Sequence, residues 1–121
     1  MSKEIDHDDA VKAIVAEWGE PFASLATDER IAFEDGKIWI TLWKQLMIDG
    51  EQQGRIGFTE PTLDQLQKLD AIPGEIGKTR RLLVQVCGLT EKEAGAIGLR
   101  DLTKAGQVLA AFTDTARATG V

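Results

Sequence analysis

The stretch DGKIWITLWKQLMIDGEQQGRIGF, residues 35–58, decides the fold class, because its hydrophobic residues follow the period of a β-strand. From residue 38 to residue 43, aliphatic positions alternate with aromatic or β-branched ones, a pattern typical of strands. The aliphatic positions are Ile38, Ile40 and Leu42, and the positions between them are Trp39, Thr41 and Trp43. We predict a strand with one aliphatic face and one aromatic face.

The second half of the same stretch predicts a hairpin. Leu46 to Ile48 and Arg55 to Phe58 are two apolar runs on either side of a polar segment. That segment contains Asp49-Gly50 and Gly54, which are typical turn residues. We therefore predict a small antiparallel meander of about three strands.

Helical signals follow Pro61 without interruption. Thr62 with Gln65, and Thr90 with Glu93, have the spacing of a capping box at the start of a helix. Pro73-Gly74 and Gly88 are expected to end the first two of four helices. In the helix over 75–87 we expect burial of Ile76, Leu83, Val84 and Cys87, with Leu82 and Val86 beside them. The apolar stripe of the last helix consists of Leu102, Ala105, Leu109, Phe112 and Ala116.

The residues before this region form an acidic extension. Residues 1–35 contain ten acidic and three basic residues, whereas residues 36–121 contain ten acidic and eleven basic ones. A helix with one apolar stripe is expected near residues 6–18, and a short helix around residues 22–26. The stripe consists of Ala10, Val11, Ile14, Val15 and Trp18. The prediction is one α+β molecule: an extension over 1–35 and an α+β domain over 36–121.

Composition excludes several classes of protein. The one cysteine, Cys87, cannot form an internal disulfide, and neither a membrane span nor a signal peptide is visible. We expect a protein of a reducing cytosol that does not contact a membrane. The net charge is −6, and neither part of the chain offers the clustered Lys and Arg that nucleic acid requires.

Residues 82–97, LLVQVCGLTEKEAGAI, have the outline of a helix-turn-helix. A DNA-reading helix presents Arg, Asn or Gln to base edges near its N-terminus. The second helix here offers only Lys92, which lies between Glu91 and Glu93. We interpret the segment as a capped helical hairpin, and a small DNA-binding regulator remains the alternative.

The order of these motifs resembles a known family. A hairpin, the phrase Thr59-Glu60-Pro61-Thr62, an apolar helix, the turn Cys87-Gly88-Leu89, the junction from Leu99 to Leu102 and a last helix succeed one another. This succession, over about Ile38 to Phe112, is similar to the small tail assembly chaperones of long-tailed bacteriophages and prophages. The chain departs from the family pattern at Thr59, where an arginine is usual, and in residues 1–35.

The resemblance implies a role in binding and no catalysis. Such chaperones coat the tape measure protein in the host bacterial cytoplasm before the tail tube polymerises, and they are not retained in the virion. A frameshifted longer form often recruits tail tube protein, and a homo-oligomer is compatible with this role. A structural tail-completion protein is a further alternative.

The sequence shows no catalytic, cofactor or metal site. Asp6-His7-Asp8-Asp9 is interpreted as a solvated helix start, because consecutive residues cannot all converge on one ion. Cys87 lies on an apolar stripe and is interpreted as a buried thiol. No phosphate-binding loop or nucleophile elbow is present, so an enzyme is not expected.

Two groups of residues are candidates for binding a protein partner. Lys78, Arg80 and Arg81 form a basic cluster that contacts an acidic partner or else pairs with Glu75 or with the acidic extension. The second group is Trp39, Thr41 and Trp43. Either the apolar stripe of the N-terminal helix covers these aromatic residues, or they dock a partner helix. A third possibility combines the two, with a tape measure segment displacing the N-terminal helix.

Overall fold

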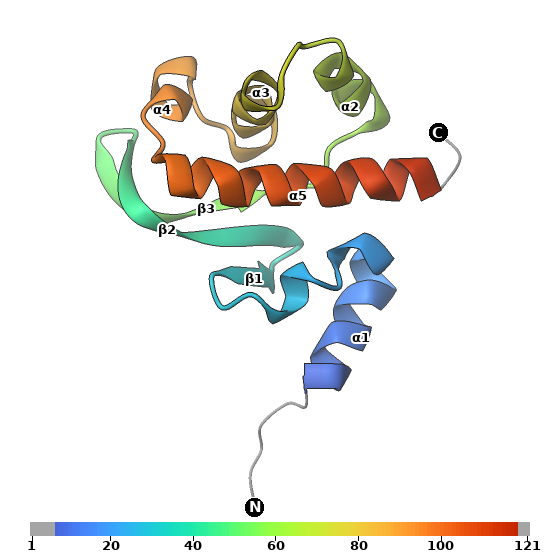
Figure 1. The fold of residues 1–121 in the computed structure, drawn as a ribbon. Helices are drawn as coiled ribbons and strands as arrows, with labels where there is room; N and C mark the ends of the chain where they lie inside the picture. The colour runs from blue at the N-terminus through green and yellow to red at the C-terminus, as the bar shows by residue number, and fades with distance from the viewer. Residues whose placement is uncertain (1–6, 119–121) are drawn as a thin grey trace, which may run out of the picture.

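The chain folds into a three-stranded antiparallel sheet with helices packed on it. The computed structural model describes residues 7–118. The strands are β1 (Ile31–Glu34), β2 (Lys37–Ile48) and β3 (Glu51–Phe58), in the spatial order β1-β2-β3. Figure 1 shows the helices α2 to α5 gathered on one side of this sheet. The α+β class and the antiparallel meander are confirmed.

The prediction of separate strands over 38–43 and 46–48 is wrong, because both belong to the single long strand β2. The pairing of β2 with β3 shifts register between Thr41 and Leu46, as at a β-bulge. At this irregularity the backbone N–H groups of Trp43 and Lys44 bond to the carboxylate of Asp101, at 2.9 and 3.1 Å. The bulge thus interrupts the alternation of side chains without ending the strand.

Both hairpins turn on an Asp-Gly pair. Asp35 and Gly36 have φ angles of 54° and 71°, and Asp49 and Gly50 have 52° and 80°. Positive φ at both central residues is the geometry of a type I′ turn, which matches the twist of paired strands. The first turn joins β2 to β1, the strand that was not predicted. The predicted domain boundary between residues 35 and 36 therefore falls inside a hairpin of the sheet.

Of the four helices after the sheet, α2 and α4 begin at the caps that were predicted for them. They are α2 (Leu63–Asp70), α3 (Glu75–Cys87), α4 (Glu91–Gly95) and α5 (Leu99–Ala118). The capping boxes of Thr62 with Gln65 and of Thr90 with Glu93 are both present. Gly88 ends α3 in the left-handed conformation, with φ of 74°. The order of helices is confirmed.

The core lies between the aliphatic face of the sheet and the helices α3 and α5. Its fully buried side chains include Ile38 and Ile40 of β2, Phe58 of β3, Leu82 and Leu83 of α3, and Ala105 and Val108 of α5. The expected burial of Ile76 is wrong, because its side chain is 69% exposed in the first turn of α3. Val84 and Cys87 are only partly buried. The core side of α3 therefore runs through Thr79, Leu82, Leu83 and Val86.

The N-terminal part of the chain packs on an aromatic cluster beside this core. Helix α1 (His7–Trp18) leads into two short 3₁₀ helices, Glu20–Phe22 and Leu25–Thr27. The ring of Phe22 lies 5.1 Å from that of Phe112 on α5, and the ring of Trp18 lies 6.0 Å from that of Phe33 on β1. These contacts attach the acidic extension to the rest of the molecule.

Within residues 7–118, no helix combines the length and the hydropathy that a membrane crossing requires.

Candidate protein-binding surfaces

The outer face of the sheet carries the aromatic residues singled out in the sequence. Ile38, Ile40 and Leu42 are buried against the helices, so the alternating side chains of β2 point the other way. Thr41 is exposed, Trp43 is 38% exposed, and Trp39 is partly buried. Trp39 and Thr41 lie on the outer face, whereas Trp43 lies in the irregular part of β2, where Arg100 and Lys104 of α5 approach its ring.

Cationic side chains cover the two tryptophan rings. The guanidinium of Arg55 lies 4.0 Å from the ring centroid of Trp39, and that of Arg30 lies 4.0 Å from that of Trp43. Arg100 approaches the Trp43 ring to 5.1 Å. Distances of this size are those of cation–π contacts. We call Arg30, Lys37, Trp39, Trp43, Arg55, Arg100 and Lys104 together the Trp–Arg face.

The interpretation in which α1 covers these tryptophans is contradicted. The stripe residues Ile14 and Trp18 pack on the core cluster, and Trp18 contacts Phe22, Phe33 and Phe112. Phe33 pairs with Ile38, so it lies on the inner face of the sheet. The third possibility, in which a tape measure segment displaces α1 from the tryptophans, is therefore also contradicted, because α1 does not cover them.

Glycine at position 57 allows the Trp39 ring to lie against β3. A Cβ atom on Gly57 would come within 2.9 to 3.0 Å of three ring atoms of Trp39, closer than real contacts allow. The indole N–H of Trp39 donates to the carbonyl oxygen of Glu34 at 3.2 Å. The ring is thus fixed across β1 and β3, and the guanidinium of Arg55 closes its outer side.

The ion pair of Asp28 with Lys104, at the edge of this face, makes stability depend on pH. Burial by itself raises the pKa of the Asp28 carboxyl, but the Lys104 ammonium and the backbone N–H of Arg30 outweigh it. The pKa therefore lies below its ordinary value of 3.8. A lowered carboxyl pKa stabilises the fold above the unfolded pKa, and this stabilisation disappears as the pH falls through the folded pKa.

We expect Asp28→Asn to be less stable than the wild type by a constant amount down to about pH 5. Below about pH 4 the difference should shrink, because the wild type then also loses its carboxylate. Urea unfolding at a series of pH values measures this difference. A difference that persists undiminished at about pH 2 would contradict the assignment.

The three residues of the predicted basic cluster, Lys78, Arg80 and Arg81, make contacts in two different places. Arg80 and Arg81 both pair with the carboxylate of Glu91, at 3.5 and 3.2 Å, and Arg80 also donates to the Glu91 carbonyl oxygen at 3.0 Å. These pairs hold α4 against α3. One interpretation expected pairing with Glu75 or with the extension, but within residues 7–118 both arginines form their salt bridges with Glu91. Lys78 lies apart from them and lines a groove.

The second helix of the helix-turn-helix outline is short and carries two acidic residues in its first turn. Helix α4 has five residues, and its Glu91 is bound by the two arginines of α3. Glu93 accepts bonds from the backbone N–H groups of Thr90 and Asp49, which lower its pKa. Both side chains thus lie at the helix start, where DNA phosphates would have to approach.

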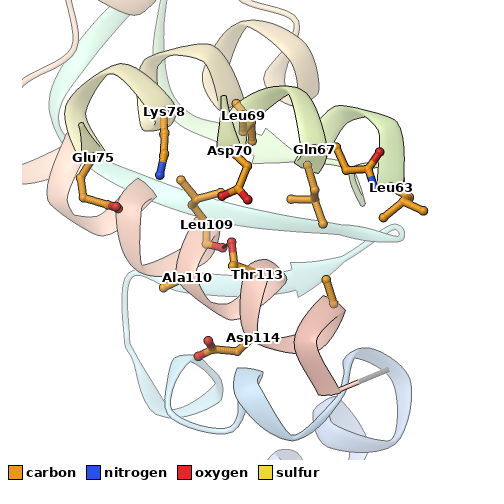
Figure 2. Close-up of a pocket in the computed structure, with 12 residues that line it drawn as sticks. Leu63, Gln67, Leu69, Asp70, Glu75, Lys78, Leu109, Ala110, Thr113 and Asp114 are labelled. Carbon is orange, nitrogen blue, oxygen red and sulfur yellow. Dashed lines mark hydrogen bonds between the residues drawn. The ribbon is translucent and has the colours of Figure 1, made fainter. Parts of the chain in front are cut away.

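A groove of about 460 Å³ opens between α2, the start of α3 and the second half of α5. Figure 2 shows its lining side chains: Leu63, Gln67, Leu69 and Asp70 on α2, Glu75 and Lys78 on α3, and Leu109, Ala110, Thr113 and Asp114 on α5. Leu66 and Ala116 also line it. Leu69 and Leu109 are buried beneath it, whereas Leu63 is 47% exposed at its edge.

The rim of the groove is acidic. Asp70, Glu75 and Asp114 contribute three carboxylates, against the one ammonium group of Lys78. Apolar floor and charged rim together are typical of a groove that receives an amphipathic helix. The sequence did not predict this groove, because α2 and α5 are distant in the chain and only their packing on α3 brings them together. One feature of the sequence could have pointed to the groove: α2 contains more leucines than it buries, and Leu63 stays exposed.

Cys87 and the motif Asp6-His7-Asp8-Asp9 are the other residues considered in the sequence. The side chain of Cys87 keeps part of its surface exposed. Burial of the rest raises the pKa of its thiol, and the nearby positive charge of Lys37 opposes this rise. A thiol of raised pKa is a poor nucleophile at neutral pH. Of the Asp6-His7-Asp8-Asp9 motif, Asp6 lies outside the described residues, and α1 begins at His7.

Comparison of the chain with known proteins gives no match to a family model, to a curated protein or to a solved structure.

Proposed function

We propose that this chain is a tail assembly chaperone of a long-tailed bacteriophage or prophage, and that its α2–α5 groove binds amphipathic helical segments of the tape measure protein. The observation that carries this proposal is a groove with leucines in its floor, polar side chains around them and the exposed side chain of Leu63 at its edge. A long amphipathic helix exposes apolar stripes that aggregate unless another surface covers them reversibly.

The charge of the rim defines the helix that fits. Three carboxylates and one ammonium group surround the apolar floor. A helix with apolar anchors at every third or fourth position and with Lys or Arg beside them complements both. The chain would act in the host bacterial cytoplasm and leave before the virion is complete. No cofactor and no catalysis belong to this role.

The structure offers less support to the alternatives. A small DNA-binding regulator needs a basic reading helix, and α4 carries two carboxylates that are held in place at its start. A tail-completion protein would be found in purified virions, whereas a chaperone should be missing from them.

The proposal is tested by Leu63→Glu, measured by co-purification with the tape measure protein of the same phage or prophage. The wild type should keep that protein soluble. The variant should bind it at least about tenfold more weakly, because one apolar anchor is lost and a charge enters the groove. Leu99→Glu is the matched control, since Leu99 is 78% exposed and does not line the groove.

Equal retention of the partner by both variants would contradict the assignment of the groove. Absence of any complex with the wild-type chain, together with no gain in the partner's solubility, would contradict the chaperone function itself.

A further inference from the structure

The Trp–Arg face is a second surface, and its charge is opposite to that of the whole molecule. The chain has a net charge of −6, yet Arg30, Lys37, Arg55, Arg100 and Lys104 surround the two tryptophans. The carboxylates that pair with these cations are Glu34 with Arg55, at 3.2 Å, and Asp28 with Lys104. Within the described residues Arg30, Lys37 and Arg100 form no salt bridge. The face thus keeps an excess of positive charge.

The stacked guanidinium groups are arranged to bind carboxylates. A guanidinium that lies over an indole ring uses its flat side for the ring and leaves its N–H edge free for an anion. The Arg30 edge is partly used, because it donates to the carbonyl oxygen of Thr41 at 2.9 Å. Arg100 contacts the Trp43 ring from the first turn of α5 and makes no side-chain hydrogen bond among the described residues.

The same chain carries a complementary segment at its start. Residues 1–9 contain Glu4, Asp6, Asp8 and Asp9 against Lys3. Figure 1 shows the N-terminal end of α1 pointing away from the sheet and from the other helices. Trp18 attaches α1 to the aromatic cluster on the inner side of the sheet, and Asp9, near the other end of this helix, is exposed.

We propose that the acidic residues 1–9 of one copy bind the Trp–Arg face of a second copy. The two contact surfaces differ, so the interaction is heterologous. Each added copy brings an unoccupied Trp–Arg face or an unoccupied acidic segment to which a further copy can bind. The interaction joins copies into a row and leaves the α2–α5 groove of each copy open. It does not depend on the function proposed for that groove.

Nucleic acid is the less favoured occupant of this face. Single strands bind by stacking bases on exposed aromatic rings. Here guanidinium groups at 4.0 Å already lie over both indoles. Stacking of a base would have to displace them, whereas carboxylates can bind at their edges without such a change.

The test is the self-association of the full chain, measured by sedimentation velocity over a range of concentrations. Association should be evident at about 0.05 M salt and largely lost at about 0.5 M, where charges are screened within a few ångströms. Arg100→Glu should weaken association at least about tenfold, because it reverses one charge of the face. Lys92→Glu makes the same charge change on α4, outside the face, and should leave association unchanged.

A charge exchange distinguishes specific contact from general repulsion. The full-chain variant Glu4→Lys/Asp6→Lys should also fail to associate with itself. Mixed with Arg100→Glu, it should form a complex more readily than either variant forms with itself, because the unaltered acidic segment of Arg100→Glu then meets the unaltered Trp–Arg face of the other variant. Leu63→Glu, which alters the groove, should self-associate like the wild type.

Absence of association at low salt, or association that Arg100→Glu leaves unchanged, would overturn the proposal. A fluorescent peptide of residues 1–9 and a single-stranded DNA oligonucleotide serve as competing probes. Binding of the peptide that Arg100→Glu weakens supports the acidic occupant. Binding of the oligonucleotide alone, with the same sensitivity, would assign the face to nucleic acid instead.

Discussion

Replacement of Asp101 by alanine is expected to lower the free energy of unfolding by about 3 kcal/mol. The Asp101 side chain is 1% exposed, and it accepts the backbone N–H groups of Trp43 and Lys44 from the irregular part of β2. Alanine leaves both donors without an acceptor in a partly buried place, and each such loss costs about 1 to 3 kcal/mol. The carboxylate also lies in the first turn of α5, where negative charge is favoured.

Asp101→Asn is the matched variant, because its amide keeps one acceptor oxygen and replaces the other with a donor. It should lose at least half of the stability that alanine loses. Urea denaturation followed by circular dichroism measures both values. If alanine lowered the free energy of unfolding by less than about 1 kcal/mol, the assignment of Asp101 as the anchor of the bulge would be wrong.

Phe22→Ala is expected to cost about 4 kcal/mol, since large-to-small changes at a buried phenylalanine typically cost about 3 to 5 kcal/mol. Phe22 is 1% exposed and contacts Trp18, Phe33 and Phe112. Its removal leaves a cavity between the N-terminal segment and α5. Tryptophan fluorescence of Trp18 and circular dichroism during thermal unfolding should both report the loss.

Phe22→Leu keeps most of the apolar volume and should cost clearly less than alanine. Leu25→Ala, on the second 3₁₀ helix, provides a comparison at a smaller buried side chain. If Phe22→Ala left the free energy of unfolding unchanged, the acidic extension would not be a stabilising part of the core.

The elements that were predicted correctly are those whose signals are local. The two capping boxes, the left-handed Gly88 and the spacing of apolar residues on α5 each depend on residues within one or two turns of each other. The alternation from Ile38 to Leu42 depends on the pleat of a single strand. Such patterns are independent of distant partners, so they survive folding unchanged.

The errors in the sheet have a different origin. The continuity of β2 through residues 42–46 depends on Asp101, a residue more than fifty positions away, whose carboxylate satisfies the N–H groups at the bulge. Strand β1 has only four residues and no clear alternation. The one local sign of β1 was Asp35-Gly36, a hairpin turn as typical as Asp49-Gly50.

The candidate surfaces were only partly predictable. The sequence placed Trp39, Thr41 and Trp43 on one face, but it could not show that arginines from β3, from the loop before β1 and from α5 would lie over the rings. The α2–α5 groove depends on the packing of three helices and has no linear motif. A surface formed by several elements can be recognised only from the tertiary structure.

The position of α5 after the sheet in the chain has a consequence for synthesis on the ribosome. Both hairpins join neighbouring segments, so the sheet can form while translation continues. Its aliphatic side, however, receives Ala105, Val108 and Phe112, and its bulge receives Asp101, only when α5 has emerged. A nascent chain that has not yet reached α5 exposes the inner side of the sheet, so the core is completed late in translation of this region.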